Sequence, residues 1–239
     1  MRRISNIIIT LLIFYSAVLA QEKKANQYGL YVIDDPQEYI TLVTEDSSKM
    51  LVNLEEYIPG LEIDVRYATT NNFLGRQVYP EAKVYARLAA AEALNKVQSE
   101  LKRQNLELKI FDAYRPYSVT VQMYETYGDT TYVASAWTGS RHNRGCAIDL
   151  TIISSETGEE IEMPTPYDDF TEKAHDGYMD LAEDVIKNRE LLKSLMEKNG
   201  FKIYSSEWWH YDFEGWKNYE LMDLSFDELS EANAQVLQR

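Results

Sequence analysis

The sequence predicts an α+β fold, because strand-like segments occur in runs that are separated by two long helical segments. The helical segments carry apolar residues at three- and four-residue steps. The strand-like segments either alternate apolar and polar residues or are continuously apolar and β-branched. Strands grouped in this way fit an α+β layout better than a regular strand–helix alternation.

The first predicted element is a half-buried strand at residues 61–67, where apolar and charged side chains alternate. Residues 71–75 interrupt the pattern and are expected to form a loop. From residue 81 to about residue 104 the spacing predicts an amphipathic helix. The apolar residues that set this spacing are Val84, Leu88, Ala91, Leu94, Val97 and Leu101.

Alternation at residues 106–110 predicts the next strand, which ends in the segment 112–116. Pro116 restricts the residue before it to extended conformations, and it can open a helix at residues 117–127.

The second half of the chain continues with a central strand, because residues 147–153 are apolar and rich in β-branched side chains. A second amphipathic helix is expected at residues 178–199, and Gly200 stands in the position of its C-cap. Short strands at residues 201–204 and 208–213 complete the pattern.

Residues 1–20 are similar to a secretory signal peptide. Two arginines precede an almost unbroken apolar run at residues 7–20, and residues 18–20 offer a cleavage site. The run is shorter than the ~20 residues that span a bilayer. We therefore expect export to the periplasm or the extracellular space, with an uncleaved membrane anchor as the alternative.

The rest of the chain reads as one domain with two additions. No Pro-, Gly- or Ser-rich linker divides it, and about 220 residues suffice for a single core. We expect a loosely attached lead-in segment at residues 21–50, the domain itself at residues 51–220, and an acidic C-terminal tail at residues 221–239.

The strong acidity of the chain limits its partners. The net charge of −15 becomes −17 without residues 1–20, since these hold two arginines and no acidic residue. Such a charge argues against nucleic acid and against stable association with an anionic membrane after signal cleavage, whereas a small zwitterionic substrate meets no such obstacle. The single cysteine, Cys146, excludes an intramolecular disulfide and is expected to be a small buried side chain. The sequence does not indicate the oligomeric state.

Two of the three histidines lie in short segments that also contain carboxylates. His142 and Asp149 are seven residues apart, and His210 follows Glu207 in the segment Glu-Trp-Trp-His. Two imidazole nitrogens and one carboxylate oxygen are a ligand set of catalytic zinc, whose fourth position holds water. We therefore predict one Zn²⁺ per chain, bound by His142, Asp149 and His210, in a metallohydrolase. Gly145 suits the turn that must bring the first two ligands together.

Two other metal sites are weaker alternatives. His175 could replace Asp149 in an all-nitrogen site, but it lies in a polar segment where a solvated histidine is ordinary. Calcium prefers six or more oxygen ligands, which this set does not offer.

Glu207 is the candidate general base, which would take a proton from the attacking water and pass it to the leaving amine. Residues three apart in a regular strand point to opposite faces, so either Glu207 precedes the strand or a bulge lies between it and His210. Arg115 is the candidate for stabilising an oxyanion. Trp208 and Trp209 are candidates for the core or for a pocket wall.

Five separated segments resemble the VanX-type D-alanyl-D-alanine dipeptidases. The matching residues are 67–75, 112–116, 140–151, 163–175 and 207–211, in the order of that family. The family consists of zinc enzymes on the fold shared with D,D-carboxypeptidases and hedgehog signalling domains. The resemblance implies an antiparallel central sheet flanked by helices, and it identifies residues 51–220 as a zinc dipeptidase domain.

The resemblance also assigns roles by position. It implies the same metal ligands, base and oxyanion-stabilising arginine that are given above. Asp168 falls where the family binds the substrate ammonium, with Tyr67 assisting it, and Ser140 matches a residue near the substrate carboxylate. Charged contacts to both termini would select a dipeptide over longer peptides.

The implied reaction is zinc-dependent hydrolysis of D-Ala-D-Ala to two D-alanines, in cell-wall peptide turnover or vancomycin-type resistance. An exported enzyme fits the recycling of wall-derived dipeptide better than cleavage before precursor assembly. The first alternative is a D,D- or L,D-carboxypeptidase acting on peptidoglycan stem peptides. The second is a non-catalytic, zinc-containing wall-binding module, for which the base Glu207 would have no use.

Overall fold

The centre of the molecule is a five-stranded sheet with the strand order β3-β5-β6-β8-β7. The computed structural model describes residues 24–238, so the predicted signal peptide lies outside the described residues. The strands are β3 (Glu62–Ile63), β5 (Leu106–Asp112), β6 (Ala147–Ser154), β7 (Phe201–Tyr204) and β8 (Glu207–Phe213). The last four pair antiparallel, whereas the edge strand β3 runs parallel to β5. The predicted α+β fold with an antiparallel central sheet is confirmed.

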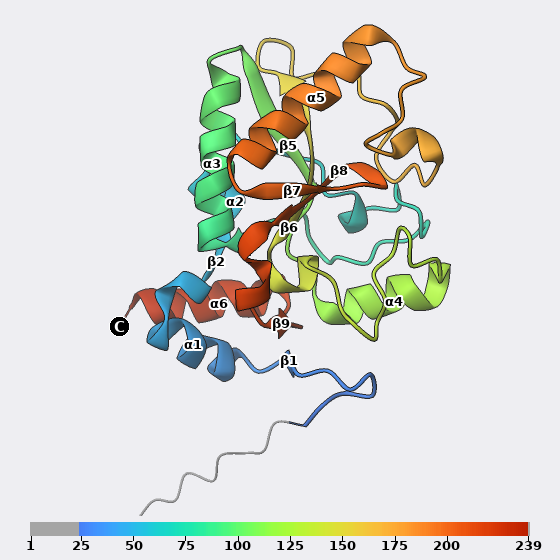
Figure 1. The fold of residues 1–239 in the computed structure, drawn as a ribbon. Coiled ribbons are helices and arrows are strands. Elements are labelled where there is room, and N and C mark those ends of the chain that lie inside the picture. Colours follow the sequence, from blue (N-terminus) through green and yellow to red (C-terminus); the bar gives the residue numbers. More distant parts are fainter. Residues whose placement is uncertain (1–23, 239) are drawn as a thin grey trace, which may run out of the picture.

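Helices flank this sheet (Figure 1). α3 (Leu88–Lys102) contacts β5, α5 (Glu183–Lys198) contacts β7, and the two helices also contact each other. α4 (Tyr117–Tyr127) lies on the other side of the sheet from α3 in Figure 1. The predicted amphipathic character of α3 is confirmed, because its apolar stripe (Leu94, Val97, Leu101) is buried.

β6 is the central strand, as predicted, with β5 and β8 on either side. Seven of its eight residues are buried, Asp149 and Thr151 among them, so both faces of the strand are covered. β6 therefore holds the carboxylate of Asp149 at a fixed position in the core.

Three predicted elements begin or end at other residues than the sequence pattern suggests. The strand expected at residues 61–67 is reduced to β3, and the chain then turns into a 3₁₀ helix at Arg66–Ala68. The helix expected from residue 81 begins only at α3, because β4 (Tyr85–Arg87) pairs antiparallel with β2 (Leu51–Asn53). A short helix, α2 (Leu54–Tyr57), follows β2. The second long helix begins at Glu183 instead of residue 178.

The segments that precede and follow the sheet pack against each other. They contain β1 (Val32–Ile33), α1 (Pro36–Glu45), β9 (Leu221–Met222) and α6 (Phe226–Leu237). β1 pairs parallel with β9, and α1 packs on α6 (Figure 1). Tyr39 is fully buried, and its hydroxyl donates to Asn233 Oδ1 at 2.8 Å. The expected loose attachment of residues 21–50 is therefore wrong for the described part of that segment.

The acidic tail is folded as well, and its helix has a clear start signal. Ser225 Oγ accepts the backbone N–H of Glu228, and the Glu228 carboxylate accepts the backbone N–H of Ser225. This capping box satisfies two amides that the helix itself leaves unpaired.

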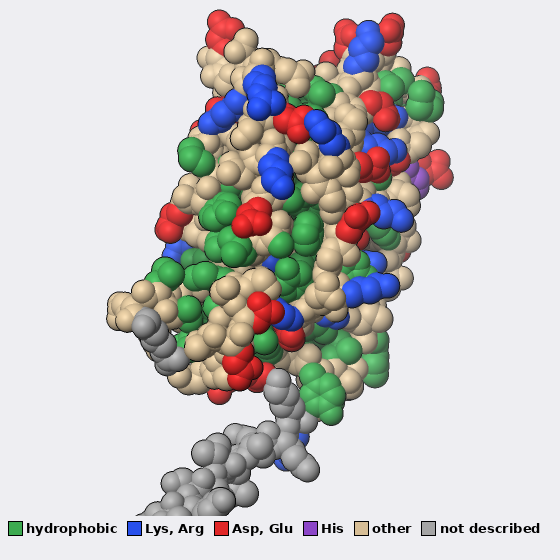
Figure 2. Space-filling view, turned by 60° about the vertical axis from the view of Figure 1, so that its left-hand side comes forward, with side chains coloured by type: hydrophobic (Ala, Val, Ile, Leu, Met, Phe, Trp, Pro, Cys, Tyr) green, Lys and Arg blue, Asp and Glu red, His purple; other side chains and the backbone are tan. Residues whose placement is uncertain are grey.

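The helices, the visible surface and the single cysteine can each be compared with the expectations from the sequence. No helix within residues 24–238 has the length and apolar character to cross a bilayer. On the face shown in Figure 2, Lys and Arg side chains lie among Asp and Glu side chains. Cys146 is fully buried, as expected, and burial raises the pKa of its thiol to about 12.

Candidate active site

The sheet brings the three predicted metal ligands together at one end of β6. Asp149 on β6 and His210 on β8 are paired residues of adjacent strands. His142 begins the 3₁₀ turn just before β6, and Gly145 ends this turn with a φ of 66°. A Cβ at Gly145 would overlap the buried Leu51 side chain, so glycine is needed for space as well as for φ.

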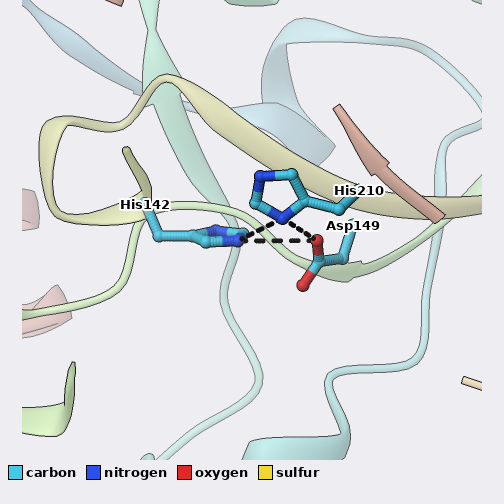
Figure 3. Close-up of side chains that lie close together, drawn as sticks. All are labelled: His142, Asp149 and His210. Atoms are coloured by element: carbon cyan, nitrogen blue, oxygen red, sulfur yellow. Dashed lines mark hydrogen bonds and ion pairs between the residues drawn. The ribbon is translucent and has the colours of Figure 1, made fainter. Parts of the chain in front are cut away.

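The three ligand atoms form a nearly equilateral triangle (Figure 3). His142 Nε2 lies 3.4 Å from Asp149 Oδ1 and 3.3 Å from His210 Nδ1. His210 Nδ1 lies 3.0 Å from Asp149 Oδ1. Ligands held tetrahedrally at ~2.0–2.1 Å from an ion are themselves about 3.3–3.4 Å apart. The triangle therefore fits three corners of a tetrahedral metal site, with the fourth corner left for water or substrate.

The opposite nitrogen of each imidazole has a partner that fixes the ring. His142 Nδ1 lies 2.6 Å from the carbonyl oxygen of Ala113, and His210 Nε2 lies 3.0 Å from Asp212 Oδ1. Both partners are oxygens that accept a hydrogen bond from the ring N–H, so in the neutral imidazoles His142 Nε2 and His210 Nδ1 carry the lone pairs. These are the two nitrogens that face each other, and such outer partners are typical of metal-binding histidines.

Asp149 completes a centre that attracts positive charge. Its Oδ2 accepts a hydrogen bond from Tyr167 Oη at 3.0 Å, while Oδ1 faces the two ligand nitrogens, His142 Nε2 and His210 Nδ1. Burial opposes the ionisation of Asp149, but His142 and His210 outweigh it and hold its pKa below the usual range. The pKa of His210 is raised, because the carboxylates of Asp212 and Asp149 outweigh the effect of burial. A buried carboxylate oxygen that faces two imidazole nitrogens is suited to a bound cation, which would replace the protons of the metal-free centre.

Glu207 lies directly beside this triangle. Its Oε2 is 3.7 Å from His210 Nδ1, and the residue is buried. A bulge brings the two side chains together, because the pairing of β7 with β8 jumps from Ile203–Tyr211 to Tyr204–Glu207. Burial raises the pKa of Glu207 to about 8. A cation at the triangle would favour the ionised form, which is the form that accepts a proton.

Arg115 lines the cavity that contains the ligand triangle, and a buried ion pair fixes its side chain. Its Nε and Nη2 donate to Asp112 Oδ2 at 2.9 and 2.6 Å, and Asp112 Oδ1 accepts a hydrogen bond from Tyr79 Oη at 2.8 Å. The guanidinium lies over the ring of Tyr67, 5.3 Å from its centroid. Burial alone would lower the pKa of Arg115, but Asp112 outweighs it and keeps the side chain charged. The geometry leaves Arg115 a fixed cation at the cavity wall.

Asp168 presents an unpaired carboxylate oxygen. Its Oδ1 accepts a hydrogen bond from Tyr67 Oη at 3.1 Å, and its Oδ2 is buried without a hydrogen-bond partner in the described chain. The backbone is left-handed, with a φ of 63°, which is uncommon outside glycine. Burial, followed by the charge of Asp149, raises the pKa of Asp168 to about 7. The free oxygen is suited to accept hydrogen bonds from a small cation such as an ammonium group.

The predicted metal ligands, catalytic residues and substrate-binding residues line one cavity of about 230 Å³. They are Tyr67, Arg115, Ser140, His142, Asp149, Asp168, Glu207 and His210. Ser140 Oγ accepts the backbone N–H of His142 at 3.2 Å, so it is tied to the metal-ligand turn. The volume is below the ~300–1,000 Å³ of pockets for drug-sized ligands. The cavity therefore suits a small substrate.

The weaker alternatives lie outside the ligand triangle. His175 Nε2 is 3.4 Å from Tyr132 Oη, and His175 is absent from the ligand cluster found in the described residues. Trp209 lines the cavity, whereas Trp208 is buried and its Nε1 donates to Thr165 Oγ1.

Sequence reasoning missed part of the cavity wall and some of the outer partners. The wall includes most of the loop at residues 130–139, whose sequence has no periodic signal. Asp112 and Tyr167 become partners of Arg115 and Asp149 only through the fold. Asp212 could have been found, because residues two apart on a strand share a face.

The chain resembles known proteins over most of its length. A family model described as D-ala-D-ala dipeptidase matches residues 47–228. The chain is 35% identical over 176 residues to a D-alanyl-D-alanine dipeptidase of Escherichia coli (strain K12), covering 74% of this chain and 91% of that protein. It is 34% identical over 181 residues to a D-alanyl-D-alanine dipeptidase of Enterococcus faecium, covering 66% of this chain and 88% of that protein.

Proposed function

The chain belongs to the D-ala-D-ala dipeptidase family, and from this membership we propose that it is a zinc enzyme that hydrolyses D-Ala-D-Ala to two D-alanines. The observation that carries the proposal is the triangle of His142 Nε2, Asp149 Oδ1 and His210 Nδ1, with a buried carboxylate, Glu207, beside it. Two nitrogens and one oxygen with an open fourth position are the donor set of a catalytic zinc, and one triangle holds one ion per chain.

The cavity offers a charged partner for the ammonium end of a dipeptide. The unpaired Oδ2 of Asp168 accepts hydrogen bonds from that group, and Tyr67 holds Asp168 in place. For the substrate carboxylate we propose Ser140, which lines the cavity at the metal-ligand turn. A peptide must match this partner and the small cavity volume together, which disfavours longer chains.

The residues of the chain divide the chemistry among them. Zinc would supply a Lewis acid that polarises the peptide carbonyl and makes water more acidic. The Glu207 carboxylate takes a proton from the attacking water and delivers it to the leaving amine. The Arg115 guanidinium, oriented by Asp112, donates hydrogen bonds to the oxygen that becomes negative during the attack.

The alternatives explain the site less well. A carboxypeptidase that takes long stem peptides has no need for a buried, unpaired carboxylate such as Asp168 in a cavity of this size. A wall-binding module that merely holds a metal has no need for Glu207 at 3.7 Å from a ligand nitrogen.

The test is the release of free alanine from D-Ala-D-Ala, L-Ala-L-Ala and N-acetyl-D-Ala-D-Ala, with and without a chelator. We expect cleavage of the free D,D dipeptide alone, and its loss on chelation. The variant Glu207→Gln should lose turnover while its zinc content, measured by atomic emission, stays near one ion per chain. Cleavage of the acetylated compound would favour a carboxypeptidase, and no cleavage of any substrate would favour the binding module.

We further propose that the enzyme acts outside the cytoplasm, in recycling or scavenging of wall-derived dipeptide. The support is the signal-like sequence of residues 1–20. Cell fractionation followed by N-terminal sequencing tests this proposal. A mature protein that begins after residue 20 in the exported fraction is expected, and full-length protein in the cytosol would contradict it.

A further inference from the structure

A loop without a role in the chemistry forms one wall of the active-site cavity. Residues 129–139 connect α4 to the metal-ligand turn, and most of them line the cavity. The loop begins after Gly128 and ends at Gly139, and these two residues have left-handed φ values of 77° and 68°. The shape of the cavity therefore depends on how this loop is held between its two glycines.

The inner side of the loop is anchored in the core. Val133 and Ala136 are buried, and Tyr117 Oη, at the start of α4, donates to the carbonyl oxygen of Ala136 at 2.6 Å. The next residue, Trp137, is 59% exposed, and its backbone N–H donates to Oγ of Ser135, a cavity-lining residue. The outer side of the loop therefore carries a large exposed side chain, the indole ring of Trp137.

A residue of the N-terminal segment holds this ring. Tyr28 meets Trp137 edge to face, with ring centroids 5.2 Å apart and planes at 86°. Tyr28 Oη also donates to Glu125 Oε1 on α4 at 2.8 Å. Tyr28 itself is fixed in a turn, because Asn26 Oδ1 accepts the backbone N–H groups of Tyr28 and Leu30.

This contact comes from a part of the chain that the family match does not include. The match begins at residue 47, whereas the turn lies at residues 26–30. In Figure 1 the blue N-terminal segment passes below α4. The segment is joined to the tail through the pairing of β1 with β9, so it is fastened at its far end as well.

We propose that Tyr28 is a positioning residue for substrate binding, which holds Trp137 and α4 together and so keeps the loop at residues 129–139 in its cavity-forming shape. Tyr28 does not line the cavity, so it acts through Trp137. A binding site that is formed only part of the time binds substrate more weakly by the fraction formed. The loss of the contact should therefore raise KM and leave the chemical step unchanged. This role of Tyr28 rests on the proposed function, because it requires that the cavity bind the dipeptide.

The first experiment measures kcat and KM for D-Ala-D-Ala in the zinc-loaded enzyme. For Tyr28→Ala we expect KM to rise about two- to tenfold, the range that the loss of an aromatic pair allows. We expect kcat to stay within about twofold and the zinc content to be unchanged. Tyr28→Phe keeps the ring on Trp137 and should retain most of the binding. Tyr31→Ala, at a 62% exposed tyrosine of the same segment, is the matched control and should behave like the wild type.

A second readout does not depend on turnover. In Tyr28→Ala, limited proteolysis within residues 129–139 should become faster, while the Tm stays close to that of the wild type, because Tyr28 is only half-buried. The double variant Tyr28→Ala/Trp137→Ala should be no worse than Trp137→Ala alone.

The outcomes separate this inference from the proposed function. Normal KM and normal proteolysis in Tyr28→Ala would overturn the inference, and so would an equal rise of KM in Tyr31→Ala. A parallel loss of kcat and Tm would indicate a merely structural role. If the wild type cleaves no dipeptide, the proposed function fails, and the proteolysis comparison still decides the role of Tyr28.

Discussion

Gly145 controls the turn that presents His142, and replacing it with alanine tests how tightly that turn is packed. The backbone at Gly145 is left-handed, and a Cβ there would overlap Leu51 and approach the Arg87 backbone nitrogen to 3.3 Å. Leu51 and Arg87 are both fully buried, so neither can move without disturbing the core. Gly158 is a matched control, because its backbone is also left-handed, at 72°, but a Cβ added there would meet no atom within 4 Å.

The two substitutions share two energetic terms and differ in a third. Left-handed alanine costs about 1–2 kcal/mol, and this cost is partly offset by ~0.4–1 kcal/mol from the stiffer unfolded chain. Both terms apply equally to Gly145→Ala and Gly158→Ala. Overpacking of a core adds roughly 1–3 kcal/mol, and it applies to Gly145→Ala alone. A difference of about 2 kcal/mol in the free energy of unfolding corresponds to a Tm about 4–8 °C lower for a domain of this size.

The assay is urea unfolding of both variants in the presence of a chelator, so that metal binding does not contribute to the measured stability. In a parallel experiment, zinc affinity is measured by competition with a chromophoric chelator, and Gly145→Ala should bind zinc more weakly because His142 is displaced. Equal unfolding free energies for Gly145→Ala and Gly158→Ala would refute the packing argument. Unchanged zinc affinity in Gly145→Ala would show that the turn does not position the ligand.

Three further predictions concern the outer partners, the ionisation of the cavity and the tail. Asp212→Ala should weaken zinc binding by about 10–100-fold, because His210 loses the acceptor that orients it; unchanged affinity in a chelator competition would contradict this. Burial raises the pKa of Asp168 from the ordinary 3.8 to about 7, so the folded, metal-free protein keeps a proton that the unfolded chain releases. Its stability should therefore fall as the pH rises from about 4 to about 7, and Asp168→Asn should flatten this slope in urea unfolding; an identical slope would count against the assignment. Ser225→Ala should lower the free energy of unfolding by about 1 kcal/mol through loss of the capping box, and a thermal melt equal to that of the wild type would show that α6 adds little stability.

The parts of the fold that could be predicted are those whose signal is local. α4 occupies the predicted residues because Pro116 marks its start, and β6 could be recognised because most of its residues are apolar or β-branched. The parts that could not be predicted depend on partners far away in sequence. β4 has the spacing of a helix, but it becomes a strand because β2 offers it hydrogen bonds.

In the candidate site, too, the residue types could be recognised from the sequence, whereas contacts between distant segments could not. Residue type and scarcity of histidine were enough to single out His142, Asp149 and His210, because few side chains bind metals. The relation of Glu207 to His210 could be stated only as a pair of alternatives. The choice between them depends on a bulge that arises from the pairing of β8 with β7, and such a bulge has no signature in one strand alone.

The contact between α1 and α6 has a consequence for biosynthesis. Tyr39 and Asn233, which it joins, are 194 residues apart, and Asn233 Nδ2 also donates to the carbonyl oxygen of Leu51. A ribosome releases the chain from the N-terminus, so the first helix must wait for the last one before it can be covered. Closing so long a loop is also entropically slow. The packing of α1 against α6 can therefore form only after the last helix has left the ribosome.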